Sequence, residues 1–232
     1  MKLGIMQPYF IPYIGYWQLM NAVDKYVIYD DVNFIKGGWI NRNRILINGI
    51  PGYINVPMQG SSPNKHINEI AVNTDERIAE KNLHTIRNAY KKAAYFEEVY
   101  PLVEKIVKCR ETNLALYIAE SFKVINNYLG ITTELLLSSD LKKNCELKGQ
   151  DKILHICDLL GATEYYNAIG GQQLYDRKIF KERQITLKFL QTDNIIYKQF
   201  TNEFYANLSI VDVMMFNSRE EVMEMLNRYT LL

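Results

Sequence analysis

The chain has 232 residues, of which 48% are hydrophobic and 23% are charged. This composition is typical of a folded globular protein and excludes an intrinsically disordered chain. The formal net charge of +1 argues against a surface that binds nucleic acid. No apolar run approaches the ~18 residues of a membrane-spanning helix, and the N-terminus lacks the pattern of a secretory signal. We therefore expect a cytoplasmic protein without a membrane partner.

The cysteines and histidines do not indicate a metal site. Cys109, Cys145 and Cys157 form no Cys-x-x-Cys pair, and the 3 histidines are widely spaced, so zinc is not expected. No serine or cysteine lies in the sequence context of a nucleophile elbow, so covalent acyl transfer through the protein is not expected either. The sequence leaves the cofactor open.

The first 44 residues contain an unusual density of aromatic and polar side chains. The apolar strand KLGIM leads into a loop with two prolines, then a helix from about Pro12 and a second strand, YVIYDD. Proline suits the first turn of a helix, where its missing N–H is not needed. Asp30 and Asp31 end the second strand. The residues that we select here as candidates for substrate binding are Gln7, Tyr9, Tyr13, Tyr16, Gln18, Lys36, Trp39, Asn41, Arg42, Asn43 and Arg44.

The middle of the chain changes from β-rich to helical. RILI, Asn48-Gly49 and IPGYINV predict a hairpin, because a type I′ turn needs positive φ at both central positions. This hairpin belongs to a β-rich insertion near residues 44–73. Apolar residues then recur with helical spacing, which predicts three helices, from 75 to about 96, from 97 to 108 and from 113 to 129.

The remainder alternates between strands and helices. TELLLSS, TEYYNAI and ITLKFLQ are predicted strands, IIYKQF is a further candidate strand, and the C-terminal tail predicts one or two helices. Alternation of this kind predicts an α/β fold with a mainly parallel, Rossmann-like sheet and helices on both faces. We find no linker or repeat, and we expect one α/β domain over residues 1–232.

Polar residues follow each predicted parallel strand. In such sheets the ligand lies outside the carboxyl ends of the strands, near the point where the strand order reverses. Gln7 follows the first strand, Asp30 and Asp31 the second, and Ser138-Ser139-Asp140 the third. The fourth ends in Asn167 and a turn with Gly170 and Gly171. We therefore expect the loop after the first strand and this glycine turn to meet at one edge.

Long stretches of the chain resemble the WbqC-like family. The resemblance is carried by QPYFIPYIGYWQLMNAVDKYVIYDDVNFIKGGWINRNRIL, by KNLHTIRNAYKKAAYF with Tyr90, by LGATEYYNAIGG and by FYANLSIVDVMMFN. Members of this family are found with genes for O-antigen and other surface polysaccharides of the lipopolysaccharide kind. The resemblance implies a transferase that attaches glycine, or a similar aminoacyl group, to an amino sugar. A weaker resemblance, of Tyr13-Ile14-Gly15-Tyr16 to the HxGH motif of nucleotidylyltransferases, lacks the histidines of that chemistry.

Amide formation on a nucleotide-linked amino deoxy-sugar needs a group that accepts the proton of the amine. His84 is the first candidate by residue type, because imidazole titrates near neutrality, and Asp30 and Asp31 are the alternatives. Arg42 and Arg44 alternate along an extended segment, so they face the same way and could bind a diphosphate or carboxylate. Tyr90, Asn167, Gly170 and Gly171 complete the set of substrate-binding candidates.

Two other functions stay open at this stage. The chain could be a non-catalytic protein that binds a sugar nucleotide or a partner in the same pathway, or an ATP-dependent ligase that forms an acyl-adenylate from an amino acid. The acyl donor is equally open between a free amino acid with ATP, a carrier thioester and a charged tRNA. The sequence does not determine the sugar or the oligomeric state.

Overall fold

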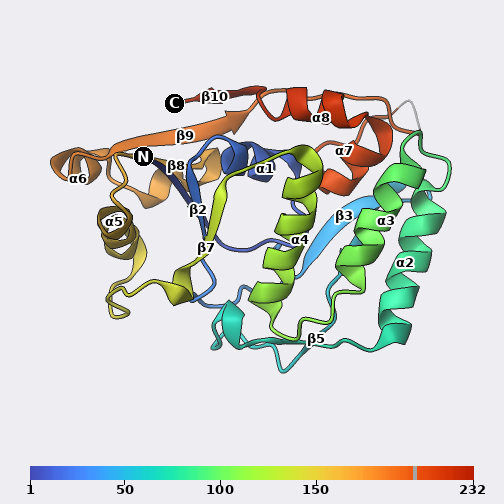
Figure 1. Cartoon of the computed structure of the whole chain (residues 1–232), viewed down its shortest axis with the longest axis horizontal. Coiled ribbons are helices and arrows are strands. Elements are labelled where there is room, and N and C mark those ends of the chain that lie inside the picture. Colours follow the sequence, from blue (N-terminus) through green and yellow to red (C-terminus); the bar gives the residue numbers. More distant parts are fainter. Residues whose placement is uncertain (201–202) are drawn as a thin grey trace.

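The computed structural model describes residues 1–200 and 203–232. Its described part contains a six-stranded sheet with the strand order β10-β9-β8-β1-β2-β7 (Figure 1). All neighbours pair in parallel except β10, which is antiparallel to β9. The strands are β1 (Lys2–Met6), β2 (Lys25–Ile28), β7 (Glu134–Leu137), β8 (Glu164–Ala168), β9 (Thr186–Thr192) and β10 (Tyr229–Leu231).

The order of the parallel strands confirms the Rossmann-like prediction. Across the sheet, the five parallel strands follow one another as β7, β2, β1, β8 and β9. Numbered by their order in the chain, they read 3-2-1-4-5, which is the strand order of that fold. The chain builds outward from β1 to β7 and then returns to the other side of β1 with β8. The strand order therefore reverses between β1 and β8, and a doubly wound sheet offers a ligand crevice at the carboxyl ends of these two strands.

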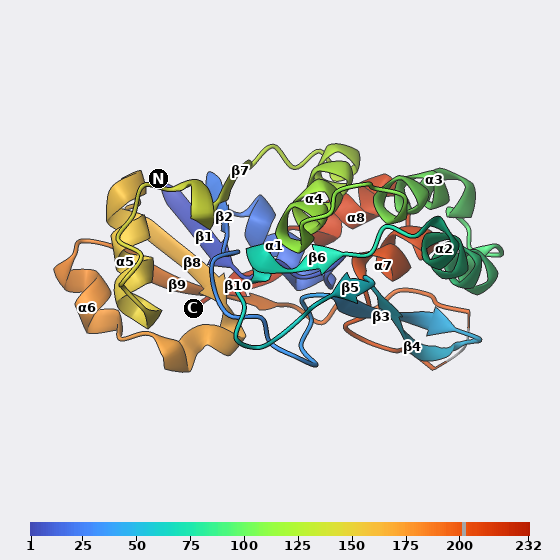
Figure 2. The ribbon, with the colours of Figure 1, turned by 90° about the horizontal axis from the view of Figure 1, so that it is seen from below.

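Helices cover both faces of the sheet, as the sequence predicts. α1 (Ile14–Asn21) and α4 (Leu114–Leu129) lie on one face, whereas α5 (Gly149–Leu160) and α6 (Arg177–Glu182) lie on the other (Figure 2). Successive side chains along each strand point to opposite faces of the sheet. Leu3 and Ile5 of β1 pack with α5 and α6, while the strand residues of opposite parity belong to the larger core under α1 and α4.

The crossover from β2 to β7 carries a lobe beside the sheet, at the right of Figures 1 and 2. It contains the predicted hairpin, in which β3 pairs with β4 across the Asn48-Gly49 turn, where both residues have positive φ. The elements of the lobe are β3 (Arg42–Ile47), β4 (Ile50–Asn55), β5 (Met58–Gln59), β6 (Ala71–Val72), α2 (Glu76–Tyr90) and α3 (Phe96–Val107).

The C-terminal segment ties this lobe to the sheet. After β9 the chain enters α7 (Ile210–Phe216), which packs on α3 and β3, and then α8 (Arg219–Met225), which packs on α4. It returns to the sheet as β10. The buried amide of Gln18 in α1 donates hydrogen bonds to the carbonyls of Met225 and Arg228, at 2.8 and 2.9 Å. The end of the chain is thus fixed to the first helix.

A buried carboxylate anchors α7 in the lobe. Asp212 is fully buried and accepts hydrogen bonds from the hydroxyls of Tyr90 and Tyr197, both at 2.6 Å, and from the amide of Gln199 at 2.9 Å. Tyr197 and Gln199 belong to IIYKQF, which is not a strand in the structure. The prediction of a strand there is wrong because this segment directs its polar side chains to Asp212 and pairs with no sheet edge.

The environment of Asp212 predicts a pH-dependent contribution to stability. Burial raises the pKa of Asp212 above 3.8, although the hydrogen bonds from Tyr197, Tyr90 and Gln199 act to lower it. A raised pKa in the folded state stabilises the protein below the unfolded pKa, and this contribution is lost as the pH rises through the folded pKa. We expect the unfolding free energy of wild type, measured in urea, to fall relative to that of Asp212→Asn as the pH rises above 3.8. A difference between the two proteins that is independent of pH would contradict this assignment.

Candidate functional site

The loop after β1 and the glycine turn after β8 leave the same edge of the sheet. β1 and β8 are parallel neighbours with Lys2 opposite Glu164 and Gly4 opposite Tyr166. The strands therefore end side by side, at Met6 and Ala168, and the two loops that the sequence predicts to meet begin at the point where the strand order reverses. The glycine turn is a 3-10 helix, Ile169–Leu174, in which Gly171 packs against Asn167. A Cβ at Gly171 would lie 2.9 Å from Asn167 Oδ1.

The loop after β1 is held in a strained conformation. Ile11 has φ of 36°, which is unfavourable for a β-branched residue. The amide of Asn43 in β3 donates to the carbonyls of Phe10 and Ile11, both at 3.0 Å, and the hydroxyl of Ser209 donates to Ile11 at 2.7 Å. We call Phe10, Ile11, Asn43 and Ser209 the Ile11 junction. It joins three segments that are far apart in the sequence.

A pocket lies over the Ile11 junction. Its volume is about 340 Å³, which is within the range of small-molecule sites. It brings together five of the residues that the sequence predicts for substrate binding. The pocket, which we call the aromatic pocket, is lined by Tyr9, Pro12, Tyr13, Trp39, Asn43, Arg44 and Asn207.

Arg44 is the one cationic residue among those seven. It alternates with Arg42 along β3, and the two guanidinium groups share one face of the hairpin, as predicted. That of Arg42 lies 4.6 Å from the Tyr53 ring centroid and donates to the carbonyls of Gly37 and Gly38. That of Arg44 lies 5.7 Å from the Trp39 ring centroid, and its buried Nε has no hydrogen-bond partner among the described residues. Arg42 therefore fixes the loop, whereas Arg44 keeps a donor free.

The two tyrosines of the pocket carry no charge near neutral pH. Burial raises the pKa of Tyr9, and the neighbouring Tyr13 raises it further. Burial also raises the pKa of Tyr13, against a hydrogen bond to Thr192 at the end of β9. A Cβ at Gly15 would collide with the Tyr13 ring and the Thr192 hydroxyl, so glycine permits this contact. Both tyrosines of the pocket therefore have protonated hydroxyls.

A second pocket of about 380 Å³ adjoins the aromatic pocket. Asn207 lines both of them, and Thr192 and Asp193 at the carboxyl end of β9 line the second. The two spaces therefore follow each other along the edge of the sheet where its parallel strands end. Asn207 was not predicted from the sequence, because its segment reaches the site only through the path of the chain after β9.

Four other predicted residues are buried and bonded within the protein. Tyr16 donates to the carbonyl of Gln7 at 2.8 Å, and Gln18 and Tyr90 make the contacts described above. The amide of Asn167 donates to the hydroxyls of Tyr165 and Tyr175 at 2.7 and 3.0 Å. None of these four side chains lines the aromatic pocket.

The two aspartates after β2 also have partners within the fold. Asp30 is buried and accepts hydrogen bonds from the backbone N–H and hydroxyl of Ser139, at 2.9 and 2.6 Å. Asp31 pairs with Lys143 at 2.8 Å and with Lys152 at 3.0 Å. Burial acts to raise the pKa of Asp31, but the ammonium groups of Lys143 and Lys152 outweigh it and hold the pKa below its usual value. These lysines had no signal in the sequence, since they follow Asp31 by more than a hundred residues.

The remaining candidates lie apart from the aromatic pocket. His84 is exposed on α2, where its Nε2 lies 2.8 Å from the Asn88 amide, and it lines none of the pockets described here. Lys36 is exposed in the loop before Trp39, and Asn41 accepts a backbone hydrogen bond from Val56. Gly170 is exposed in the turn after β8. The structure thus gathers Tyr9, Tyr13, Trp39, Asn43 and Arg44 and leaves the three predicted proton acceptors elsewhere.

The structure also bears on metal binding and on membrane insertion. Among residues 1–200 and 203–232, no group of three or more histidines, cysteines, aspartates or glutamates is arranged to hold a metal ion. In the same residues, every helix is too short or too polar to span a bilayer.

Comparisons with known proteins identify relatives over nearly the whole chain. A family model described as the WbqC-like protein family matches residues 7–224. The chain is 30% identical over 217 residues to "Uncharacterized protein Rv1507c" of Mycobacterium tuberculosis (strain ATCC 25618 / H37Rv), which covers 92% of each protein. No solved structure matches the chain.

The ion pairs of Asp31 lead to a prediction about stability. The side chains of Lys143 and Lys152 are only 1% and 7% exposed, so removal of their common carboxylate leaves two buried ammonium groups without a counter-charge. We expect Asp31→Asn to lower the unfolding free energy by about 3–5 kcal/mol. Urea unfolding at neutral pH measures this, with Asp140→Asn as the control, since Asp140 is exposed on the neighbouring loop. Equal stability of the two variants would contradict the role of Asp31.

Proposed function

This chain belongs to the WbqC-like protein family, and on that premise we propose that it transfers an acyl group to an amino group of a nucleotide-linked amino deoxy-sugar. Glycine is the first candidate for that group, and surface-polysaccharide biosynthesis, including that of O-antigen, is the pathway. The observation that carries the proposal is Arg44, a guanidinium with an unpaired buried donor, placed between aromatic side chains at the edge where the parallel strands end.

The chemistry of the aromatic pocket suits a sugar nucleotide. A buried donor without a partner costs about 1–3 kcal/mol, and a ligand oxygen would remove this cost. Guanidinium groups bind diphosphates and carboxylates through two parallel hydrogen bonds. Trp39, Tyr9 and Tyr13 supply ring surface for a base or sugar, and their polar edges match hydroxyl groups. A single cation with neutral neighbours favours a ligand with a localised anionic group.

The dimensions of the site suit an extended ligand. The aromatic pocket and the adjoining pocket measure about 340 and 380 Å³ and share Asn207. We place the diphosphate at Arg44, with the nucleoside and the sugar on either side of it. In this arrangement the amino sugar or the acyl donor reaches the second pocket, where Asp193 can pair with an ammonium group.

A second candidate function is a non-catalytic sugar-nucleotide-binding protein. It is favoured by the positions of His84, Asp30 and Asp31, none of which lines the aromatic pocket. The oxygens of Asp30 are engaged by Ser139 and Asn68, and Asp31 is engaged by two lysines. His84 is the candidate with an exposed ring, so it is the one that solution chemistry can reach.

Ligand binding tests the role of Arg44. Thermal unfolding is measured with a panel of nucleoside diphosphates linked to amino deoxy-sugars, because a ligand of the folded state raises the melting temperature. We expect Arg44→Gln to weaken the binding of the best ligand about tenfold or more, and Arg44→Lys to weaken it less. Arg183→Gln is the control, since Arg183 forms an exposed ion pair with Asp158. A panel that leaves wild type unchanged would contradict the substrate class, and equal binding by Arg44→Gln would contradict the site.

A measurement of turnover distinguishes an enzyme from a non-catalytic binding protein. Wild type and His84→Gln are compared for ligand affinity and for formation of the acylated sugar, followed by mass spectrometry, with glycine supplied as the free amino acid with ATP, as a thioester or as glycyl-tRNA. An enzyme that uses His84 loses turnover in the variant and keeps its affinity. The absence of product from every donor, with intact binding, would favour the second candidate. Release of pyrophosphate that requires both ATP and glycine would identify an adenylate-forming ligase.

A further inference from the structure

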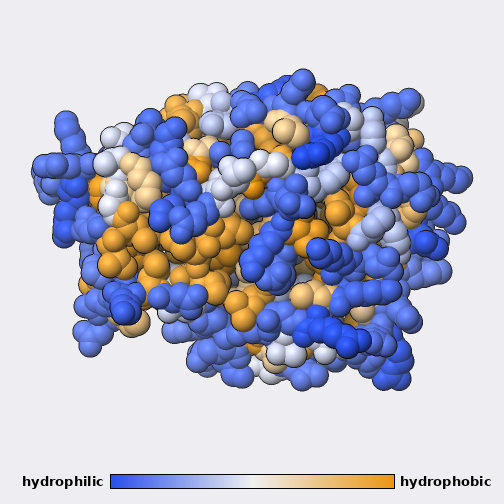
Figure 3. Space-filling view, viewed as in Figure 1, coloured by the Kyte–Doolittle hydropathy of each residue, from blue (hydrophilic) through white to orange (hydrophobic). Residues whose placement is uncertain are grey.

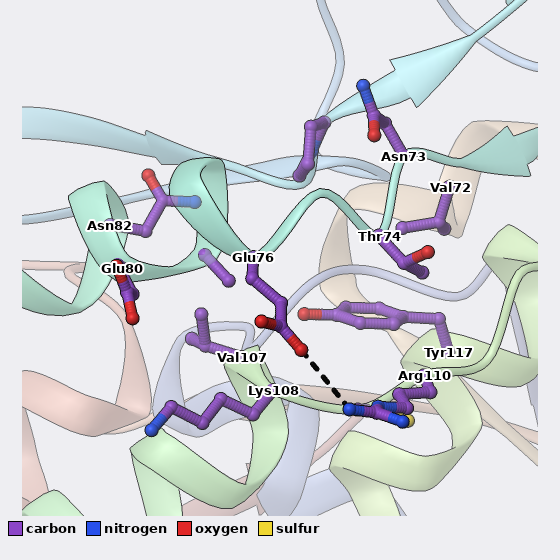
Figure 4. Close-up of a pocket in the computed structure, with 13 residues that line it drawn as sticks. Val72, Asn73, Thr74, Glu76, Glu80, Asn82, Val107, Lys108, Arg110 and Tyr117 are labelled. Carbon is purple, nitrogen blue, oxygen red and sulfur yellow. Dashed lines mark hydrogen bonds and ion pairs between the residues drawn. The ribbon is translucent and has the colours of Figure 1, made fainter.

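A separate pocket lies in the lobe, between the first turns of α2, the loop after α3 and the start of α4 (Figure 4). Its volume is about 230 Å³, and it shares no lining residue with the aromatic pocket. Val72, Ala79, Val107 and the ring of Tyr117 give it apolar walls. The proposed sugar-nucleotide site does not use this space, which we call the lobe pocket.

The hydroxyl of Tyr117 is one of the polar groups that line the lobe pocket. The residue is only 4% exposed, and the hydroxyl has no hydrogen-bond partner within the described part of the chain. Figure 4 shows the ring across the pocket, with the hydroxyl directed into the space beside Glu76. The hydroxyl is open to the pocket, so it is available to a ligand atom or to water.

Charged side chains of both signs surround the opening. Glu76 and Arg110 form an ion pair at 3.1 Å, with side chains 80% and 87% exposed (Figure 4). Lys108 and Glu80 line the same pocket. An ion pair with this exposure contributes little to stability, so a ligand that carries both charges can separate Glu76 from Arg110 and pair with each of them.

Size and charge together select the ligand class. A space of about 230 Å³ is below the range of typical cofactor sites, which favours a ligand smaller than a nucleotide sugar. Two opposite charges above an apolar floor match a zwitterion with a short side chain. We propose that the lobe pocket binds a small free α-amino acid. Its carboxylate pairs with Arg110 and accepts a hydrogen bond from Tyr117, its ammonium group pairs with Glu76, and its side chain contacts Val72 and Val107.

Calorimetric titration with glycine, L-alanine, L-serine and L-valine tests the ligand class. Propionate and n-propylamine are the matched probes, since each carries one of the two charges on a three-carbon chain. We expect at least one amino acid to bind with a stoichiometry of one, and both half-analogues to bind about tenfold more weakly or not at all. Absence of binding by all four amino acids, or equal binding of a half-analogue, would overturn the proposal.

Variants of the lobe pocket test its location. Tyr117→Phe removes only the hydroxyl, so we expect the melting temperature of the ligand-free variant to be unchanged or slightly higher than that of wild type. We expect the affinity of the variant for the amino acid to be about tenfold lower. Tyr128→Phe is the matched control on the same helix, because the Tyr128 hydroxyl bonds to Glu98 outside the pocket.

Charge and site specificity require a second pair of variants. Arg110→Gln should weaken amino-acid binding by a similar factor, whereas Arg77→Gln, which removes another exposed ion pair of α2, should not. Arg44→Gln should leave amino-acid binding intact, so that the two sites fail independently. Binding that survives both Tyr117→Phe and Arg110→Gln would place the amino acid elsewhere and overturn the assignment.

Discussion

The hydrogen bonds that converge on the carbonyl of Ile11 are the constraint on which the candidate site depends. Asn43 and Ser209 donate to that carbonyl from β3 and from the start of α7. They hold a β-branched residue at φ of 36°, a conformation that the loop would not keep unaided. The same contacts bring Arg44 and Asn207 beside Tyr9 and Tyr13. The strain is therefore confined to Ile11. The segments that hold it by hydrogen bonds, around Asn43 and Ser209, also contribute residues that line the pocket.

The charged groups of this protein divide into those that support the fold and those that can meet a ligand. Asp30, Asp31 and Asp212 are all engaged by donors from distant parts of the chain, and each ties one segment to another. Such groups are costly to bury but make the native arrangement specific. Arg44 differs from them, because its buried Nε is left without a partner. The Tyr117 hydroxyl can also meet a ligand, because it is open to the lobe pocket.

The two pockets occupy different parts of the molecule and differ in chemistry. The aromatic pocket adjoins the edge where the parallel strands end, and it combines a single cation with three large rings. The lobe pocket lies between α2 and α4 and combines opposite charges with an apolar floor. The helix α7 packs on β3, which carries Arg44, and on α3, whose Val107 lines the lobe pocket.

Local patterns in the sequence determine the elements of the fold, because strand alternation, helical spacing and the Asn48-Gly49 turn depend on neighbouring residues. They also indicate the Rossmann-like class and the meeting of the first loop with the glycine turn, since parallel strands share an edge. They do not distinguish Arg44, whose buried Nε has no hydrogen-bond partner among the described residues, from Arg42, whose guanidinium donates to the carbonyl of Gly38. Tyr16, Gln18 and Tyr90 looked equally suited to a ligand, yet they are buried. Only the tertiary structure decides the roles of Gln18 and Tyr90, because their partners Met225 and Asp212 come from the last segment of the chain.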